Sequence, residues 1–138
     1  MNYIVIDLAL GDSGKGSITE YLVRKFNSQL VVKFSGGPQS SHHVVLSDGR
    51  WHPFSQFGAG TFSGARTYLS KYVMFEPYAF LNEAKALLSN GIINPIPMVT
   101  VDPDCLVISP WQWKANRWRE LARGENRHGS CGMGIGET

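Results

Sequence analysis

The feature of this sequence that most constrains its fold is a glycine-bearing loop, residues 11–17, between an apolar run and a helical pattern. The preceding run, Tyr3–Leu8, has the length of a strand and is rich in β-branched residues, which is typical of a buried parallel strand. After the loop, apolar residues recur at helical spacing over residues 18–26, and a second apolar run spans Leu30–Phe34. This order predicts a βαβ unit with a right-handed crossover.

Further strands are expected in the middle of the chain. Residues 43–54 carry two strand-like runs around an Asp-Gly pair, which favours a β-hairpin. Short apolar runs at Tyr68–Phe75, Met98–Val101 and Cys105–Ile108 predict single strands. The fold class is therefore expected to be α/β, with a mostly parallel sheet, flanking helices, an antiparallel hairpin and a P-loop-like N-terminal βαβ unit.

Two more helices are indicated by their start and stop residues. Pro77 suits the first turn of one helix, and Gly91 suits its end. Ser109 and Pro110 have the pattern of an N-cap followed by a first helical residue. The buried face of this last helix is expected to consist of Trp111, Ala115, Trp118, Leu121 and Ala122.

Composition and charge exclude several classes of protein. With 138 residues, 43% hydrophobic and 17% charged, the chain is long enough for one packed domain and is not of disordered composition. Two cysteines are too few for a disulfide framework, and Asp7 interrupts the N-terminal apolar run. No run approaches the ~20 apolar residues that span a bilayer. We therefore expect a cytoplasmic protein without a membrane partner, and the net charge of +2 argues against nucleic acid.

The loop at residues 11–17 has the chemistry of an anion site. Its backbone N–H groups precede a helix N-terminus, and Lys15 adds a positive charge. The match to the phosphate-binding pattern G-x-x-x-x-G-K-[ST] is partial, because the pattern requires glycine at Ala9 and a hydroxyl at Gly16. The alternative is a plain strand–helix turn with an exposed lysine. We favour phosphate binding because the loop lies between a strand and a helix.

A second loop, Gly36–His43, follows the second expected strand. In an open α/β sheet, loops at the carboxyl ends of neighbouring strands meet at one crevice. The two loops are therefore expected to face each other, which would let His42 donate a proton or contact a phosphate. The alternative is that His42 is a loop histidine without a role.

Three glycine-rich motifs follow one another along the chain, at residues 11–16, 36–42 and 130–136. They read Gly-Asp-Ser-Gly-Lys-Gly, then Gly-Gly with a histidine after four residues, then Ser-Cys-Gly-Met-Gly-Ile-Gly. They resemble the Gly-Asp-Glu-Gly-Lys-Gly, Gly-Gly-x-Asn-Ala-Gly-His-Thr and Thr-Thr-Gly-Arg-Gly-Ile-Gly segments of the adenylosuccinate synthetase family. Order and approximate spacing agree over nearly the whole chain, which therefore resembles the N-terminal part of that family.

The resemblance implies a GTP-dependent ligase of purine biosynthesis. In that family an aspartate deprotonates the purine of IMP, the 6-oxygen attacks the γ-phosphate of GTP, and free aspartate displaces the 6-phosphoryl group. By position, Asp12 is then the base and a neighbour of Mg²⁺, and His42 is the acid that assists departure of GDP. The backbone carbonyl of Ser41 is expected at Mg²⁺ as well. ATP stays open as an alternative phosphoryl donor.

The same resemblance implies which residues hold nucleotides. The expected phosphate-holding residues of the first motif are Gly11, Ser13, Gly14, Lys15, Gly16 and Ser17. The residues expected to hold the nucleoside monophosphate are Gln39, Ser130 and Cys131. The expected partners are therefore a purine nucleoside monophosphate and aspartate, and a homodimer is left open.

Several positions depart from the family pattern. Ser13 replaces its glutamate, residues 39–43 replace Asn-Ala-Gly-His-Thr, and Cys131 and Met133 replace threonine and arginine. In the family, these positions lie where the purine nucleotide binds, so the identity of the substrate is open. A phage branch of the family uses dGMP to make a 2-aminoadenine precursor and carries a small residue in place of the base. Asp12 favours the ordinary chemistry, although the Val-Ile-Asp-Leu run before the loop is more like the phage form.

Length bears on the same question. Family members are considerably longer than 138 residues, and this chain ends inside the third motif. We therefore expect residues 1–138 to form one nucleotide-binding α/β domain, an N-terminal fragment of a longer enzyme that is incomplete as a catalyst. The alternative is a non-catalytic nucleotide-binding remnant.

Overall fold

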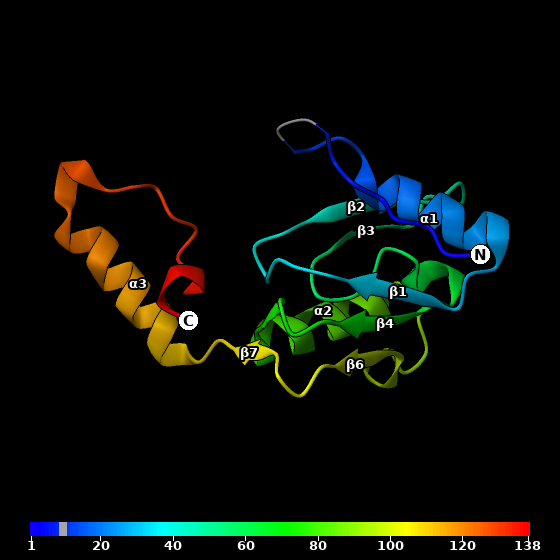
Figure 1. Cartoon of the computed structure of the whole chain (residues 1–138). Helices are drawn as coiled ribbons and strands as arrows, with labels where there is room; N and C mark the ends of the chain where they lie inside the picture. The colour runs from blue at the N-terminus through cyan, green and yellow to red at the C-terminus, as the bar shows by residue number, and fades with distance from the viewer. Residues whose placement is uncertain (9–10) are drawn as a thin grey trace.

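The computed structural model describes residues 1–8 and 11–138. Ala9, where the phosphate-binding pattern requires glycine, lies outside the described residues. The structure confirms the α/β class, with a parallel sheet, flanking helices and an antiparallel strand pair (Figure 1). Within the described part of the chain, no helix has the length and hydrophobicity needed to cross a membrane.

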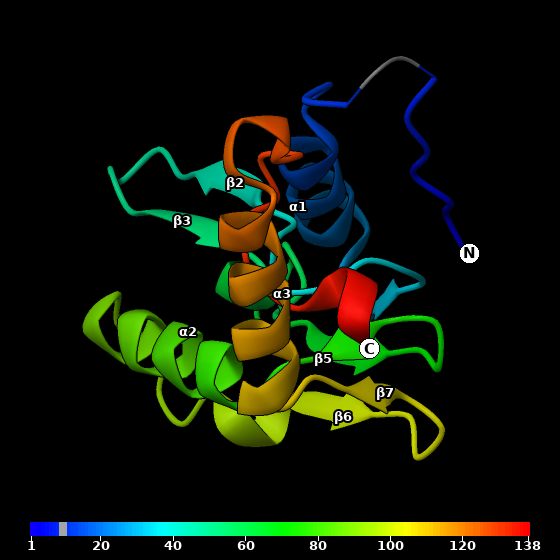
Figure 2. The same ribbon diagram turned by 90° about the vertical axis from the view of Figure 1, so that its left-hand side faces the viewer.

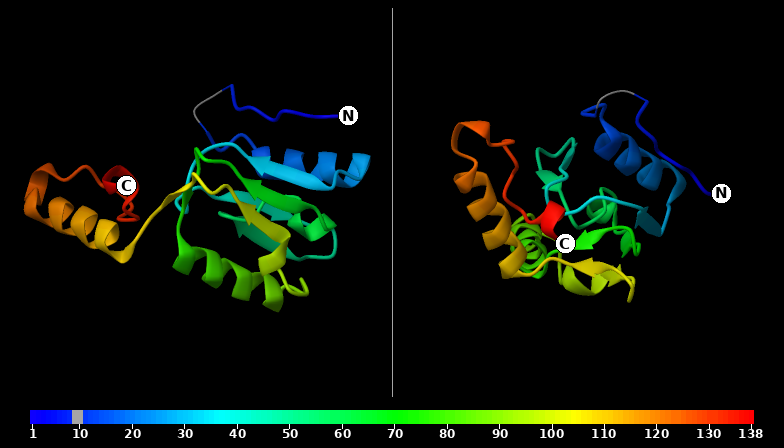
Figure 3. Two further views of the ribbon diagram at one scale, coloured as in Figure 1. Left: turned by 60° about the horizontal axis from the view of Figure 1, so that its bottom comes forward. Right: turned by 60° about the vertical axis from the view of Figure 1, so that its left-hand side comes forward.

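The central element is a parallel sheet of three short strands. Its strands are β1 (Leu30–Lys33), β4 (Arg66–Leu69) and β6 (Val99–Val101), in the spatial order β1-β4-β6. Both neighbouring pairs are parallel, and the three strands lie side by side in the left view of Figure 3. The strands predicted near residues 30 and 99 are thus confirmed.

An antiparallel hairpin flanks this sheet. It consists of β2 (His42–Val45) and β3 (Trp51–Phe54), as the Asp-Gly pair predicts. The turn closes with a hydrogen bond of 2.8 Å from Leu46 N to the carbonyl oxygen of Arg50. The hairpin lies between α1 (Lys15–Phe26) and the α2 helix described below, as Figures 1 and 2 show. This placement brings His42, the first residue of β2, to the start of α1.

The strand expected at Tyr68–Phe75 is divided in the structure. Residues 70–73 form a turn, in which Val73 N donates to the carbonyl oxygen of Ser70 at 2.9 Å. The chain after this turn forms β5 (Met74–Phe75), which pairs in parallel with β7 (Leu106–Val107). A largely apolar run does not reveal such a turn, because hydrophobic periodicity reports burial and not chain reversal.

The helices begin where the sequence predicts. Besides α1, they are α2 (Pro77–Ser89) and α3 (Pro110–Ala122), and both begin with proline. Ser109 caps α3 in a capping box with Gln112. Four short 3₁₀ turns complete the described elements, at Thr61–Ser63, Ile96–Met98, Gly124–Asn126 and Ile135–Glu137.

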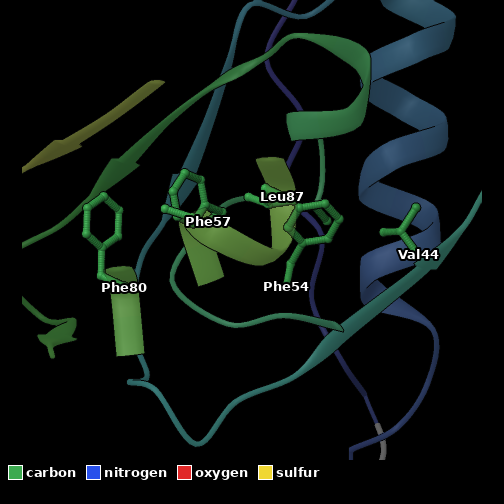
Figure 4. Packing of buried hydrophobic residues seen from close by; sticks show 7 residues of the cluster. Val44, Phe54, Phe57, Phe80 and Leu87 are labelled. Atoms are coloured by element: carbon green, nitrogen blue, oxygen red, sulfur yellow. The ribbon is translucent and has the colours of Figure 1, made fainter. Parts of the chain in front are cut away.

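The main core lies between the hairpin, the segment that follows it and α2 (Figure 4). Val44 and Phe54 of the hairpin belong to one buried cluster with Phe57, Phe80 and Leu87. The rings of Phe57 and Phe80 stack with their centroids 4.9 Å apart. Burial of one such side chain stabilises a fold by roughly 1.5–3 kcal/mol. The cluster therefore holds the hairpin firmly against α2.

The N-terminal segment departs from the prediction, because Tyr3–Leu8 forms no strand. Ile4 is 89% exposed, and the ring of Tyr3 stacks on Phe26 of α1 with centroids 4.6 Å apart. An apolar strand is stable in a parallel sheet only when both sheet faces are covered. The outer face of β1 is uncovered by the described chain, since Val32 is exposed. The helix and second strand of the expected βαβ unit form, and its first strand does not.

The predicted buried face of α3 is also wrong. Trp111 is 74% exposed, Trp118 66% and Leu121 71%, while Ala122 is exposed and Ala115 half-buried. Figures 1 and 3 show α3 projecting from the body that contains the sheet, with the C-terminal segment folded back against it. The apolar spacing therefore identified a helix correctly, but no described residue covers most of this face.

Candidate functional site

The first glycine loop leads directly into α1. Asp12 is exposed and adopts φ 53°, and the helix begins at Lys15. Gly16, in the first turn, is buried against the start of β2. A Cβ at Gly16 would lie 2.8 Å from both the carbonyl carbon of His42 and the carbonyl oxygen of His43. This close approach explains why glycine stands where the phosphate-binding pattern has a hydroxyl residue.

Asp7 connects the N-terminal segment to this loop. Lys15 Nζ lies 2.5 Å from Asp7 Oδ2, and Ser13 Oγ donates to Asp7 Oδ1 at 2.9 Å. The pair is partly buried, with 29% of the Lys15 side chain and 12% of the Asp7 side chain accessible. A phosphate that binds Lys15 would therefore have to displace the Asp7 carboxylate.

The first and second loops meet, as expected, although by a different contact. The start of α1 packs on β2, and Ser17 Oγ donates to the carbonyl oxygen of His43 at 3.3 Å. His42 is half-buried there. Burial, together with the positive charges of Lys33 and Lys15, lowers the pKa of His42 below its usual value of 6.5. The positive charges of Lys15 and Lys33 thus act on a histidine whose neutral form is favoured.

The third motif reaches the second loop through Ile135. A Cβ at Gly37 would lie 2.7 Å from Ile135 Cδ1 and 2.8 Å from Gln39 Oε1. Ser130 and Cys131, by contrast, are exposed and lie beside α3, where Ser130 Oγ is 3.4 Å from Asn116 Oδ1. The structure therefore brings Lys15, Gly16, Ser17 and His42 together, whereas Ser130 and Cys131 lie against another element.

A buried lysine that the sequence motifs do not include lies beneath the second loop. Lys33 is 7% exposed and donates to the carbonyl oxygen of Ser55. Burial lowers its pKa to about 8, against the opposing effect of the negative charge of Glu83. The signal was present in the sequence, because Lys33 is the charged residue within the apolar run Leu30–Phe34.

Glu83 of α2 anchors the same network. Its carboxylate accepts hydrogen bonds from Ser55 N at 2.8 Å and from Gln56 N at 2.6 Å. Ser55 Oγ in turn donates to the carbonyl oxygen of Pro38 at 2.8 Å. The backbone and side chain of Ser55 thus link Lys33 and Glu83 to the second glycine loop. This network fixes the loop that carries Gln39.

Comparison with protein families and curated proteins gives a consistent answer. A family model described as adenylosuccinate synthetase matches residues 4–138. The adenylosuccinate synthetases of Psychrobacter cryohalolentis and Neisseria gonorrhoeae are 31% and 30% identical to the chain. Each match covers 98% of this chain and 31% of the relative. The chain therefore spans about a third of the length of these curated relatives.

Solved structures share the fold. Fully ligated adenylosuccinate synthetase from Plasmodium falciparum matches with a TM-score of 0.75 at 18% identity, over 91% of this chain and 29% of its own. Succinoaminodeoxyadenylate synthetase of cyanophage S-2L, bound to dGMP and dATP, matches with a TM-score of 0.61 at 23% identity. That match covers 83% of this chain and 30% of the phage chain. Since the family model also spans nearly the whole sequence, the chain belongs to the adenylosuccinate synthetase family.

Proposed function

We propose that this chain is the phosphate-handling part of a purine-nucleotide ligase that condenses IMP with aspartate, with GTP as phosphoryl donor. The observation that carries the proposal is the meeting of the first two glycine loops around Lys15, Gly16 and His42. Phosphoryl transfer depends on positioning and charge stabilisation more than on covalent chemistry by the protein. A helix N-terminus with lysines and a histidine beside it supplies both.

In the proposed reaction, each polar residue of the two loops has one task. The Asp12 carboxylate takes a proton from the purine, whose 6-oxygen then attacks the γ-phosphorus of the donor. His42 gives a proton to the departing nucleoside diphosphate. The amino group of aspartate then forms the C–N bond as the 6-phosphoryl group leaves. The residues around Lys15 hold the donor phosphates, and Gln39, Ser130 and Cys131 hold the monophosphate.

The electrostatics around His42 fit the role of an acid that becomes charged only in the complex. Without ligand, burial and the charges of Lys33 and Lys15 lower its pKa. Phosphate groups bound at the start of α1 would offset the positive charge around His42 and so favour the imidazolium form. The acid would then carry its proton when the leaving group requires it.

A magnesium ion fits the residues that are present. The Asp12 carboxylate and the Ser41 carbonyl are hard oxygen donors, and both residues are exposed. No group of three or more His, Cys, Asp or Glu residues with metal-binding geometry occurs in the described ranges. Mg²⁺ needs no such cage, since it is usually held by one or two carboxylates, waters and substrate phosphates. When bound, the ion would neutralise charge on the transferred phosphoryl group.

A second candidate substrate is dGMP. The solved phage relative is bound to dGMP and dATP, and Ser13 departs from the family glutamate here. Asp12 retains the proton-abstracting group that IMP requires, which favours IMP. The alternative chemistry would make this chain part of a 2-aminoadenylosuccinate synthase with ATP or GTP as donor.

The proposal is tested by ligand binding and turnover with the purified chain. Calorimetric titration in the presence of Mg²⁺ should detect GTP or ATP, and turnover is assayed with aspartate and IMP, GMP or dGMP. Asp12→Asn should abolish any turnover yet retain donor binding. Absence of binding by every nucleotide would overturn the proposal. Binding without turnover would favour a non-catalytic remnant or an incomplete fragment, whereas ordinary ligase rates would refute incompleteness.

A further inference from the structure

Glu120 in the last turn of α3 makes an unusual set of contacts with the third motif. Its carboxylate accepts from three consecutive backbone N–H groups, those of His128 at 3.4 Å, Gly129 at 2.9 Å and Ser130 at 3.2 Å. Arg123 also donates to the same carboxylate. Successive N–H groups that converge on one point form an anion-binding concavity. In this structure the anion is a side chain of the protein itself.

The surroundings of this concavity suit a phosphate group. A hollow of about 330 Å³ lies beside it, lined among others by Arg119, Arg123, Ser130 and Cys131. Arg119 pairs with Glu137 and Arg123 with Glu120, so both guanidinium groups are neutralised from within the chain. Guanidinium groups and backbone N–H groups recognise phosphate as well as carboxylate.

We propose that Glu120 is an internal placeholder, whose carboxylate occupies the 128–130 backbone concavity until the phosphate of a purine mononucleotide displaces it. The inference rests on the proposed function and adds a regulatory contact to it. In the free chain the Glu120 carboxylate occupies the same three N–H groups that the ligand phosphate would use. On binding, the ligand phosphate replaces the Glu120 carboxylate at the three N–H groups and Arg123, and the Glu120 side chain turns to solvent.

The charge state of Glu120 is consistent with such competition. Burial works to raise the pKa of its carboxyl group, but the hydrogen bonds from Ser130 N–H, the Arg123 guanidinium and the N–H groups of His128 and Gly129 together lower it. The carboxylate therefore stays ionised at neutral pH and competes with an incoming anion. A ligand must bind more tightly to the open concavity than Glu120 does.

The alternative is that Glu120 is only a structural anchor for the C-terminal segment. The two interpretations predict opposite signs for Glu120→Gln, which keeps an oxygen acceptor and removes the charge. Loss of an anchor loosens residues 128–130 and weakens ligand binding. Loss of a placeholder removes a competitor and strengthens binding. Glu125→Gln is the matched control, because Glu125 is exposed a few residues away and the change in net charge is the same.

The experiment titrates the 138-residue chain and both variants with IMP and, separately, with inorganic phosphate at constant ionic strength. Amide resonances of residues 128–130 are followed by NMR. We expect Glu120→Gln to tighten both ligands about five-fold, which is the scale expected for removal of one competing charge. Glu125→Gln should change affinity less than about two-fold, as expected for a charge in solvent. Equal or weaker binding by Glu120→Gln would refute the placeholder.

A separate readout distinguishes failure of this inference from failure of the proposed function. GTP with Mg²⁺ should perturb amides of residues 11–17 equally in all three proteins. If GTP binds there and Glu120→Gln leaves phosphate affinity unchanged, the placeholder is wrong and the proposed function stands. If phosphate binds more tightly to Glu120→Gln but no purine nucleotide binds either site, the competition between Glu120 and phosphate stands, whereas the purine ligand and the proposed function are wrong.

Discussion

A single glycine sets how closely the two proposed phosphate loops approach each other. Gly16 is buried, and its missing Cβ is the space into which the backbone of His42 and His43 fits. The sequence alone presents Gly16 as a defect in a phosphate-binding pattern. The structure shows that the departure is required by packing, because no side chain can be added without moving β2.

We expect Gly16→Ser, the residue that the phosphate-binding pattern prefers, to destabilise the chain. The added atoms would overlap the backbone of β2, and overpacking of this kind costs about 1–3 kcal/mol. Urea unfolding measures the loss. Gly136→Ala is the control, since a Cβ there would meet no heavy atom within 4 Å, and it should change stability by less than about 0.5 kcal/mol. Equal effects of both substitutions would contradict the packing argument.

The titration of His42 gives a second prediction at the residue scale. Its pKa in the folded chain lies below 6.5, so the unfolded chain binds the proton first as pH falls. The stability that this histidine supports is therefore fully present above pH 6.5 and is lost as pH falls through the folded pKa. NMR titration of the His42 ring should give a midpoint below 6.5. Lys15→Met should raise that midpoint, and a wild-type midpoint at or above 6.5 would contradict the prediction.

At the scale of elements, local sequence signals were sufficient to locate a helix or hairpin whose start, end or turn is set by its own residues. Proline starts, the Asp-Gly turn and helical spacing located α2, α3 and the hairpin. The local signals failed where a strand or a buried helix face depends on residues from elsewhere in the chain to cover it. The run Tyr3–Leu8 is strand-like, but the uncovered sheet face leaves it unpaired, and α3 exposes Trp118 for the same reason.

The buried network beneath the second loop shows how one element supports another. We expect Glu83→Ala to destabilise the chain by about 3 kcal/mol, because Ser55 N and Gln56 N would lose their acceptor and Lys33 its opposing charge. Thermal and urea unfolding measure this loss. Lys85→Ala on the same helix is the control, since Lys85 is exposed. Similar stability of the two variants would show that the network does not hold the loop.

At the scale of the whole molecule, the candidate site comes from three separated segments, and the sequence predicted only part of their arrangement. The rule that loops at neighbouring strand ends converge led to the expectation that the first two loops lie together. In the structure they meet instead through the packing of α1 on β2. The partner of Lys33, the carbonyl oxygen of Ser55, and the placement of Ser130 beside α3 depend on tertiary contacts that no local pattern encodes.

The contact between Ile135 and Gly37 is where the third motif reaches the second loop. We expect Ile135→Ala to weaken this contact by about 1 kcal/mol, since part of a half-buried aliphatic side chain is removed. Local opening should then increase, so amide hydrogen exchange should accelerate about five-fold over residues 130–138 and stay unchanged in β1 and β4. Leu121→Ala is the control, because Leu121 is 71% exposed and its loss should leave exchange as it is. Unchanged exchange in Ile135→Ala would mean that contacts with α3 alone hold the third motif in place.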